Sequence, residues 1–247
     1  MQIFGIVGKT LIHSYSQEYF TKKFTQNNIE HNEYELFSLN NIEEIRELLK
    51  MPSLCGFNVT IPYKSKIIPY LDELDTVAQE VGAVNCVIKR NNKWIGYNTD
   101  VVGFENTIQT ILLSSRLTPL RSYGLVLGSG GAGKAVCYVL KQRKIPFQIV
   151  SRNKIAERIT YHEVTESHIR KAAFIINTTP IGMFPNIDEM PQIPYSALDN
   201  EHILIDLIYN PEETLFLKEG KKHGALTING MTMFTVQAGA SYDLMVR

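Results

Sequence analysis

A chain of 247 residues is long enough for one large or two medium domains, and a content of 44% hydrophobic and 20% charged residues is that of an ordinary globular protein. The 25 basic and 25 acidic residues balance, which gives no overall attraction to nucleic acid or to an anionic membrane surface. No apolar run approaches the roughly 18 residues of a membrane span. We therefore expect neither nucleic acid nor a membrane among the partners.

The three cysteines, Cys55, Cys86 and Cys137, are scattered and lie among apolar neighbours. Such thiols are typical of a protein core in a reducing cytoplasm. The first eight residues read as a strand and not as a leader, because they lack a basic start and a long apolar core. The six histidines show no spacing typical of metal ligands. We therefore expect a cytoplasmic protein with no metal.

The first hundred residues alternate between strand and helix patterns. They predict a strand over 2–8, a loop over 11–16, a helix over 18–28, a strand over 33–39, a helix over 42–50, a strand over 54–60 and a helix over 71–81. Pro62 stops the third strand and can start a helix at 63–64. The turn Asn91-Asn92 predicts a hairpin between strands over 83–90 and 93–97. This part of the chain therefore forms an α/β unit of its own.

The rest of the chain predicts a second unit. Asp100 precedes an apolar-striped helix over 101–113, and the polar stretch 114–122 reads as the connection between the units. Strands are then predicted over 123–127, 147–150, 172–177, 203–207 and 225–228, and helices over 134–141, 166–171, 212–223 and 231–246. Alternating strands and helices favour an α/β fold with a parallel sheet and helices on both faces.

The loop Gly128–Gly133 matches the pattern G-x-G-x-x-G between a predicted strand and a predicted helix. Such a loop lets backbone N–H groups approach a pyrophosphate at the positive end of the helix. An ordinary tight turn that binds no ligand would have the same glycine pattern. In this context the loop predicts a dinucleotide site.

The segment Ser151-Arg152-Asn153-Lys154, which follows the next strand, bears on which dinucleotide binds. An NAD site usually carries an acidic residue about 20 positions on, bonded to the ribose, whereas the nearest acid here is Glu157. Arg152 and Lys154 suit the extra 2′-phosphate of NADP, although a solvated basic turn would look the same. The segment favours NADP.

Four sets of polar residues end apolar strands, where open α/β sheets place their ligands. The sets are Ser14 with Ser16; Asn58, Thr60 and Lys64; Asn85 with Asp100; and Tyr209 with Gln237. Ser14 and Ser16, two apart in an extended loop, could share one anionic oxygen, although loop serines are more often turn formers. Taken alone, Lys64 reads as a surface charge, Asp100 as a helix cap and Gln237 as a solvent-facing residue.

From about Phe4 to its C-terminus the chain resembles the shikimate dehydrogenases. The resemblance rests on the order and spacing of short motifs. They are 13–16 (HSYS), 58–64 (NVTIPYK), 82–85 (GAVN), 96–103 (GYNTDVVG), 128–133 (GSGGAG), 177–183 (NTTPIGM), 206–211 (DLIYNP), 229–233 (NGMTM) and 237–238 (QA).

The resemblance implies two domains with a cleft between them: 1–100 with 230–247 as an α/β substrate-binding domain, and 101–229 as a Rossmann-like, doubly wound NADP-binding domain. It also implies NADPH-dependent interconversion of 3-dehydroshikimate and shikimate, with Lys64 and Asp100 as the acid–base pair, in a monomer or homodimer. The implied substrate contacts are Ser14, Ser16, Thr60, Asn85, Asp100, Tyr209 and Gln237. The implied cofactor contacts are Gly128, Ser129, Gly130, Gly131, Ala132, Arg152, Leu207 and Gly230.

The chain departs from the family pattern at Gln17, where a proline is common, and in the 2′-phosphate loop, where Asn-Arg-Thr is replaced by Ser151-Arg152-Asn153. One alternative is therefore a quinate/shikimate dehydrogenase of relaxed cofactor use. Another is a sensor without catalysis that binds nucleotide or shikimate. The presence of both Lys64 and Asp100 argues against the sensor, because a sensor needs no proton donor.

Overall fold

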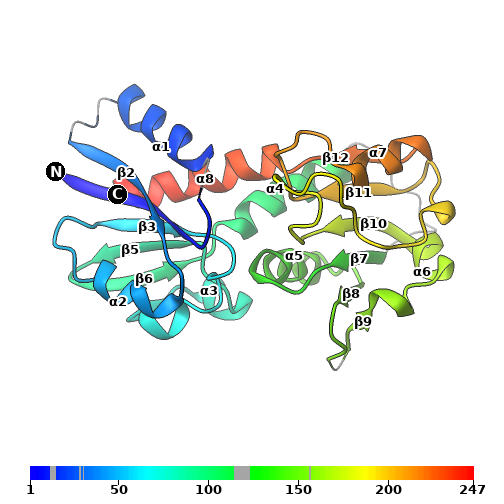
Figure 1. The fold of residues 1–247 in the computed structure, drawn as a ribbon, viewed down its shortest axis with the longest axis horizontal. Coiled ribbons are helices and arrows are strands. Elements are labelled where there is room, and N and C mark those ends of the chain that lie inside the picture. Colours follow the sequence, from blue (N-terminus) through cyan, green and yellow to red (C-terminus); the bar gives the residue numbers. More distant parts are fainter. Residues whose placement is uncertain (12–14, 28, 30, 114–122, 156) are drawn as a thin grey trace. The chain divides into compact units, whose positions relative to one another are not determined.

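The computed structural model describes residues 1–11, 15–27, 29, 31–113, 123–155 and 157–247 (Figure 1). The chain divides into two compact units. The first is Met1–Val102 with Val236–Arg247, and the second is Gly103–Thr235. The boundaries fall inside helices α4 (Asp100–Leu113) and α8 (Met231–Val246). Each unit is built on one six-stranded sheet.

The sheet of the first unit is mixed and has the order β2-β1-β3-β5-β6-β4. Its strands are β1 (Gln2–Gly8), β2 (Asn32–Ser38), β3 (Gly56–Val59), β4 (Glu73–Leu74), β5 (Cys86–Arg90) and β6 (Lys93–Tyr97). Strand β1 runs parallel to β2 and β3, whereas β5 runs antiparallel to β3 and β6. The β5–β6 hairpin turns at Asn91 and Asn92, whose φ angles are 50° and 60°, as a tight two-residue turn requires.

These strand directions bring several strand ends to one edge of the sheet. The carboxyl ends of β1, β3 and β6 lie beside the amino end of β5, because β5 alone among them runs the opposite way. The register aligns Asn58 with Cys86, and Cys86 with Tyr97. Residues just beyond these positions in the chain are therefore neighbours in space.

The core of the first unit is formed by apolar side chains from the sheet and from the segments that follow it. Phe57 and Ile67 are fully buried, and Trp94 is 7% exposed. The Phe57 and Trp94 rings lie 5.7 Å apart, centroid to centroid. The helical elements here are α1 (Tyr15–Gln26), η1 (Ile42–Glu44), α2 (Ile45–Leu48), η2 (Ile68–Tyr70) and α3 (Thr76–Val81).

The sheet of the second unit is entirely parallel and has the order β12-β11-β10-β7-β8-β9 (Figure 1). Its strands are β7 (Tyr123–Leu127), β8 (Phe147–Ser151), β9 (Ile159–Thr160), β10 (Ala172–Asn177), β11 (Ile203–Asp206) and β12 (Leu226–Ile228). Counted from β7 as the first strand, this is the 3-2-1-4-5-6 order of the Rossmann fold. Strand order reverses between β7 and β10, and ligands bind at such a switch point, beyond the carboxyl ends of the strands.

Helices and short turns complete the second unit. They are α5 (Gly131–Gln142), η3 (Tyr161–Glu163), α6 (Glu166–Lys171), η4 (Tyr195–Ala197) and α7 (Leu215–Lys222). Their apolar faces join strand residues such as Leu125, Ile175 and Leu204 in one core that also contains Phe216. Among the described residues, no helix has the length and hydropathy needed to cross a membrane.

Most predicted elements are confirmed, although several begin up to three residues away from the predicted position, such as β5, α5 and α7. The sequence predicted a helix over 71–81, but Glu73–Leu74 pair with β6 as strand β4, so the helix begins only at Thr76. No helix starts at 63–64, where the chain forms turns. The first helix begins at Tyr15, ahead of the predicted 18. Strand β9 was not predicted, since two residues are too few to show a period.

Candidate active site

Lys64 and Asp100 form a largely buried ion pair in the first unit, with Lys64 Nζ 2.6 Å from Asp100 Oδ2. Their side chains are 15% and 6% exposed. Lys64 is held in the turn after β3, where its carbonyl accepts the Val84 N–H at 2.7 Å. Asp100 is the first residue of α4, just beyond β6. The sheet edge described above thus brings together two residues that are 36 positions apart.

Asn85 holds the second oxygen of the same carboxylate. Its Oδ1 accepts the backbone N–H of Thr99 at 2.6 Å, and this fixes the orientation of the amide. Its Nδ2 therefore faces Asp100 Oδ1, to which it donates at 2.9 Å. Asp100 thus accepts one bond from a cation and one from a neutral amide, one at each carboxylate oxygen.

Gln237 of α8 lies against this group. Its Oε1 accepts from Asn85 Nδ2 at 3.2 Å and from the Thr99 hydroxyl at 3.3 Å. The reading of Gln237 as a solvent-facing helix residue is therefore wrong. The reading of Asp100 as a plain helix cap is also wrong, because Lys64 and Asn85 donate to its two oxygens and the Val101 N–H donates to Asn98 Oδ1.

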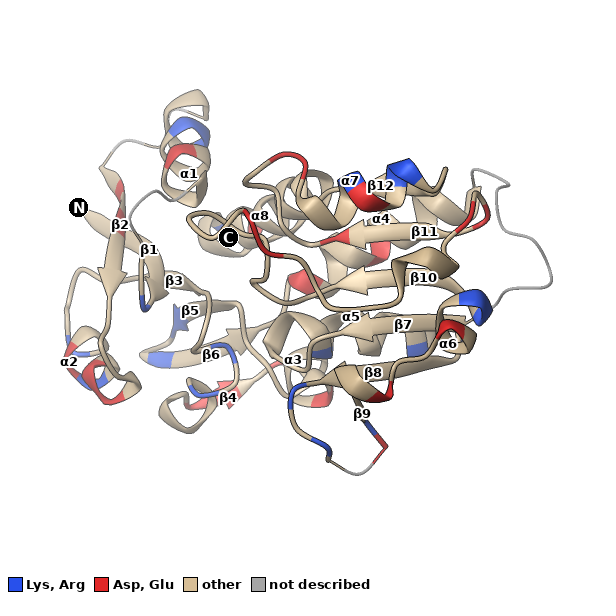
Figure 2. Cartoon of the chain, turned by 45° about the vertical axis from the view of Figure 1, so that its right-hand side comes forward, with Lys and Arg blue, Asp and Glu red and all other residues tan. Residues whose placement is uncertain are grey.

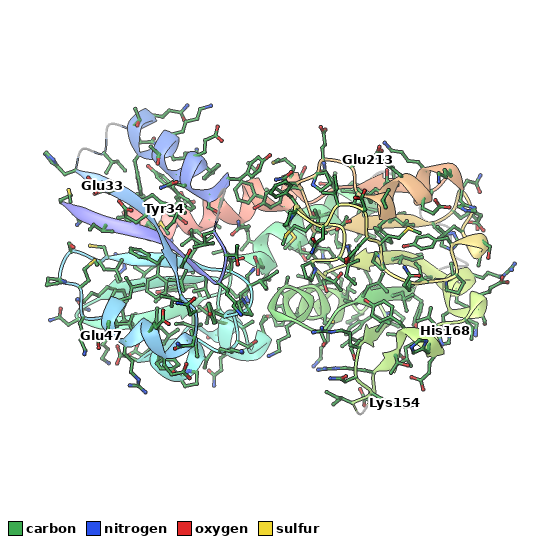
Figure 3. All side chains as sticks on the ribbon, viewed as in Figure 1. Glu33, Tyr34, Glu47, Lys154, His168 and Glu213 are labelled. Atoms are coloured by element: carbon green, nitrogen blue, oxygen red, sulfur yellow. The ribbon has the colours of Figure 1, made fainter. Side chains whose placement is uncertain are left out.

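A chain of buried hydrogen bonds supports Asn85 from behind. The Tyr34 hydroxyl donates to Asn58 Oδ1 at 2.8 Å, and Asn58 Nδ2 donates to the Asn85 carbonyl and to Ser241 Oγ. Ser241 Oγ lies 2.9 Å from Thr99 Oγ1. Figure 3 labels Tyr34 on β2. Sequence reasoning missed Tyr34 and Ser241 as parts of this site, because their partners are 24 and up to 183 positions away.

The other predicted substrate contacts of the first unit are less closely tied. Ser14 lies outside the described residues. Ser16 is 8% exposed and lies in the first turn of α1, so its placement in an extended loop is wrong. Thr60 is half-buried directly after β3, and its N–H donates to the Val7 carbonyl at 2.8 Å. Within the described part of the chain, no hydrogen bond joins the Ser16 or Thr60 side chain to Lys64 or Asp100.

In the second unit the glycine-rich loop joins β7 to α5 as predicted. Gly128 has φ +113°, and a Cβ there would lie 2.6 Å from Thr178 Oγ1. A Cβ at Gly133 would lie 2.8 Å from the Gly128 carbonyl oxygen. Gly130, the residue before the first turn of α5, has no atom within 4 Å of such a Cβ. The loop is therefore closed on its inner side and open beside Gly130, at the helix N-terminus.

Ser129, Gly131 and Ala132 complete the loop and are half-buried. Basic residues follow the neighbouring strand β8, and Figure 2 shows them in the loop between β8 and β9. Arg152 is exposed. Burial raises the pKa of the Tyr161 phenol to about 12, although the positive charge of Arg152 acts to lower it. Lys154, at the outer end of this loop in Figure 3, is paired with Glu163. Lys154 therefore has its charge matched by Glu163, whereas no ion pair joins Arg152 to another of the described residues.

Leu207 and Gly230 come together near the end of β11. The Gly230 N–H donates to the Ile208 carbonyl at 3.0 Å, and a Cβ at Gly230 would lie 2.1 Å from the Leu207 oxygen. Only glycine fits this approach. The Tyr209 ring packs on Phe234, with centroids 4.8 Å apart. These three predicted residues therefore share one end of the second unit.

Asp206 is a buried carboxylate of the second unit to which the sequence assigned no role. It is the last residue of β11 and is 0% exposed. Burial raises its pKa to about 6, although Thr214, Ile208 and Asn177 all donate hydrogen bonds to it. Within the described part of the chain, no three His, Cys, Asp or Glu residues gather as a metal site would need.

The Rossmann order, the glycine-rich loop at its switch point and the Lys64–Asp100 pair are the features of a dinucleotide-binding α/β oxidoreductase. Comparison with known proteins gives the family. The family model described as the shikimate dehydrogenase substrate binding domain matches residues 6–87. The shikimate dehydrogenase (NADP(+)) of Clostridium beijerinckii is 37% identical over 250 residues, covering 96% of this chain and 89% of that protein.

Solved structures agree with this match. The shikimate dehydrogenase of Aquifex aeolicus is 30% identical, with a TM-score of 0.85 over 99% of this chain and 92% of that one. The shikimate 5-dehydrogenase of Thermus thermophilus, solved with NADP(H) and shikimate, is 26% identical, with a TM-score of 0.83 over 99% and 93% of the two chains. The present chain belongs to the shikimate dehydrogenase family and is an oxidoreductase.

Proposed function

We propose that the chain catalyses the reversible NADPH-dependent reduction of 3-dehydroshikimate to shikimate. The observation that carries the proposal is the buried Lys64–Asp100 pair, oriented by Asn85 at a sheet edge. Family membership supports the reaction, since relatives that cover almost the whole chain are named shikimate dehydrogenase (NADP(+)).

The Lys64 ammonium is the proton donor. In the reduction, negative charge develops on the keto oxygen of the substrate, and an ammonium at hydrogen-bond distance stabilises and then protonates that oxygen. Asp100 accepts from Lys64 at 2.6 Å and holds Nζ in one place. In the oxidation of shikimate, the same amine takes the proton from the hydroxyl.

The second unit fits a dinucleotide. The space beside Gly130 is open and no side chain of the N-cap residue caps α5, so a pyrophosphate could meet the backbone N–H groups of its first turn. Arg152 would take the 2′-phosphate, because it is exposed just beyond the neighbouring strand, whereas Lys154 is paired with Glu163. Bound NADPH supplies the hydride that reduces the keto carbon.

Substrate recognition falls to neutral donors and acceptors around the pair. Asn85 donates to Asp100, and Gln237 accepts from Asn85, so their amide groups can favour a substrate that carries ring hydroxyls over one that lacks them. We propose that the unit Met1–Val102 with Val236–Arg247 binds the substrate and that Gly103–Thr235 binds NADPH. The further substrate contacts in this proposal are Ser14, Ser16, Thr60 and Tyr209; the further cofactor contacts are Gly128, Ser129, Gly131, Ala132, Leu207 and Gly230.

The experiment compares Lys64→Ala with Lys66→Ala, a change at an exposed lysine two positions on. Loss of the proton donor should lower kcat by roughly two to four powers of ten. The affinity for NADPH should not change, because Lys64 lies in the other unit. Lys66→Ala should behave like the wild type. Full turnover by Lys64→Ala would refute the assigned role.

A further inference from the structure

The Asp206 carboxylate is surrounded by neutral donors. Asn177 Nδ2 and the Ile208 N–H donate to Oδ1 at 3.1 and 3.0 Å, and the Thr214 hydroxyl donates to Oδ2 at 2.6 Å. No Lys, Arg or His of the described residues pairs with it. A buried carboxylate without a cation is costly, because burial disfavours its charged form.

The three donors come from the end of one strand and from the connection that follows another, since Ile208 and Thr214 both lie between β11 and α7. Asn177 ends β10, and its Oδ1 accepts the N–H and hydroxyl of Thr179 at 3.1 and 2.6 Å. The adjacent Thr178 donates to the Leu127 carbonyl, directly before Gly128. Asp206 is thus connected through Asn177 to the turn that packs against the glycine-rich loop.

The other two donors lead to the Leu207–Gly230 region and to α7. Ile208 donates to Asp206 through its N–H and accepts the Gly230 N–H through its carbonyl. Thr214 caps α7 by accepting from the Leu217 N–H and donates its own proton to Asp206. One carboxylate therefore connects the end of β10 with both ends of the β11–α7 connection, at the carboxyl edge of the strands, where ligands of such sheets bind.

We propose that Asp206 is a positioning residue for the cofactor: as a carboxylate, it fixes the segments beginning at Asn177 and Leu207 in the arrangement that binds NADPH. The inference rests on the proposed function, since it takes NADPH as the ligand of the second unit. An ionised carboxylate accepts from all three donors, whereas an asparagine or a protonated carboxyl presents a donor of its own, which only the Thr214 hydroxyl can accept. In either neutral form the Thr214 hydroxyl loses the acceptor for its proton, and its oxygen is shared with the Leu217 N–H, so this connection is weakened.

The titratable groups that act near Asp206 are Tyr195 and Glu219, and neither changes its charge near neutral pH. The Asp206 charge acts on the Tyr195 phenol of η4, and burial together with this charge raises the pKa of Tyr195 far above its ordinary value. Glu219 of α7 also acts on Tyr195. Asn177 from β10 and Thr214 before α7 do not titrate. Burial raises the pKa of Asp206 itself to about 6.

The test measures the Kd of NADPH by its fluorescence, at several pH values between 8 and 5, for the wild type and Asp206→Asn. At pH 8 the variant should bind about tenfold more weakly or worse, as expected for loss of a hydrogen bond to a charged group. At pH 5 the two Kd values should converge, because the wild type is then protonated. The ratio of the Kd values cancels the protonation of the 2′-phosphate of NADPH, which both proteins share.

A ratio that stays constant from pH 8 to pH 5, or equal binding at pH 8, would overturn the inference. If Asp206→Asn does not fold, Thr214→Val and Thr214→Ser take its place. Thr214→Ser keeps the hydroxyl that donates to Oδ2 and should bind NADPH like the wild type, whereas Thr214→Val should bind NADPH about tenfold more weakly. Equal binding of NADPH by both variants would also overturn the inference. A wild type that does not bind NADPH would contradict the proposed function and this inference together. Tight binding by the wild type with no effect of Asp206→Asn would overturn the inference alone.

Discussion

Removing the Lys64 side chain should destabilise the first unit and not only stop turnover. Lys64 Nζ lies 2.6 Å from an Asp100 carboxylate that is 6% exposed. Deleting one partner of a buried pair leaves an uncompensated charge and costs about 3–5 kcal/mol. The Lys64 side chain is itself 15% exposed, so water reaches part of the pair. We therefore expect the lower end of that range, about 3 kcal/mol, for Lys64→Ala.

The double variant Lys64→Ala/Asp100→Asn separates stability from catalysis. It removes the orphaned carboxylate, and the Asn85 amide keeps a neutral oxygen to which it can donate. Most of the lost stability should return, because replacing both partners of a buried pair is close to neutral. Turnover should stay lost in both variants, because neither has a proton donor at this position.

The assay is denaturant unfolding followed by tryptophan fluorescence. Trp94 is the only tryptophan of the sequence and lies in the core of the first unit, so its signal reports on that unit. Lys93→Ala is the matched control, because Lys93 pairs with Glu73 at 2.5 Å with side chains 58% and 47% exposed. Such surface pairs contribute little. A Lys64→Ala midpoint equal to that of Lys93→Ala, or a double variant no more stable than the single one, would refute the reasoning.

Three further predictions concern the second unit. Arg152→Ala should weaken the binding of NADPH tenfold or more and leave the binding of NADH unchanged. Lys154→Ala should have a smaller effect on NADPH binding, because Glu163 already pairs with that lysine. Equal losses of affinity for NADPH and NADH in a binding titration would contradict the assignment of Arg152 to the 2′-phosphate. Gly133→Ala should lower both the melting temperature and NADPH affinity, since its Cβ would lie 2.8 Å from the Gly128 oxygen, whereas Gly130→Ala should lower affinity alone; unchanged melting of Gly133→Ala would be the contrary result. Asp206→Asn should gain stability relative to the wild type as the pH rises from 4 to 8. The pKa of Asp206, raised to about 6, means that the folded wild type favours the protonated carboxyl, and the wild type loses this stabilisation as the pH rises through 6. A difference in melting temperature between the two proteins that does not vary with pH would contradict the raised pKa.

Much of the fold could be predicted because the second unit is locally regular. Its apolar strands are bounded by turn residues and its glycine-rich loop has a fixed spacing, so β7, α5, α6 and β10 were all found. Strands β4 and β9 were missed because two-residue strands have no period of their own. The pairing of β4 and β9 depends on the neighbouring strands β6 and β8, and not on the residues of β4 and β9 themselves.

The candidate site was predictable only in part. Lys64, Asn85 and Asp100 carry the family motifs, and the structure joins them by hydrogen bonds. Ser241 was not singled out from the sequence, and Asp206 was included in a motif without a role, because a serine inside a helix and an acid that ends a strand are both common. Their importance depends on burial and on distant partners, such as Asn58 for Ser241.

The most direct test of the account is the formation of NADPH from NADP⁺ and shikimate, followed by the absorbance of NADPH, for the wild type and Lys64→Ala. We predict a shikimate-dependent rise with the wild type, a rate lower by roughly two to four powers of ten with Lys64→Ala, and much slower reactions when quinate replaces shikimate or NAD⁺ replaces NADP⁺. No NADPH formation by the folded wild type, or faster oxidation of quinate with NAD⁺, would contradict the account.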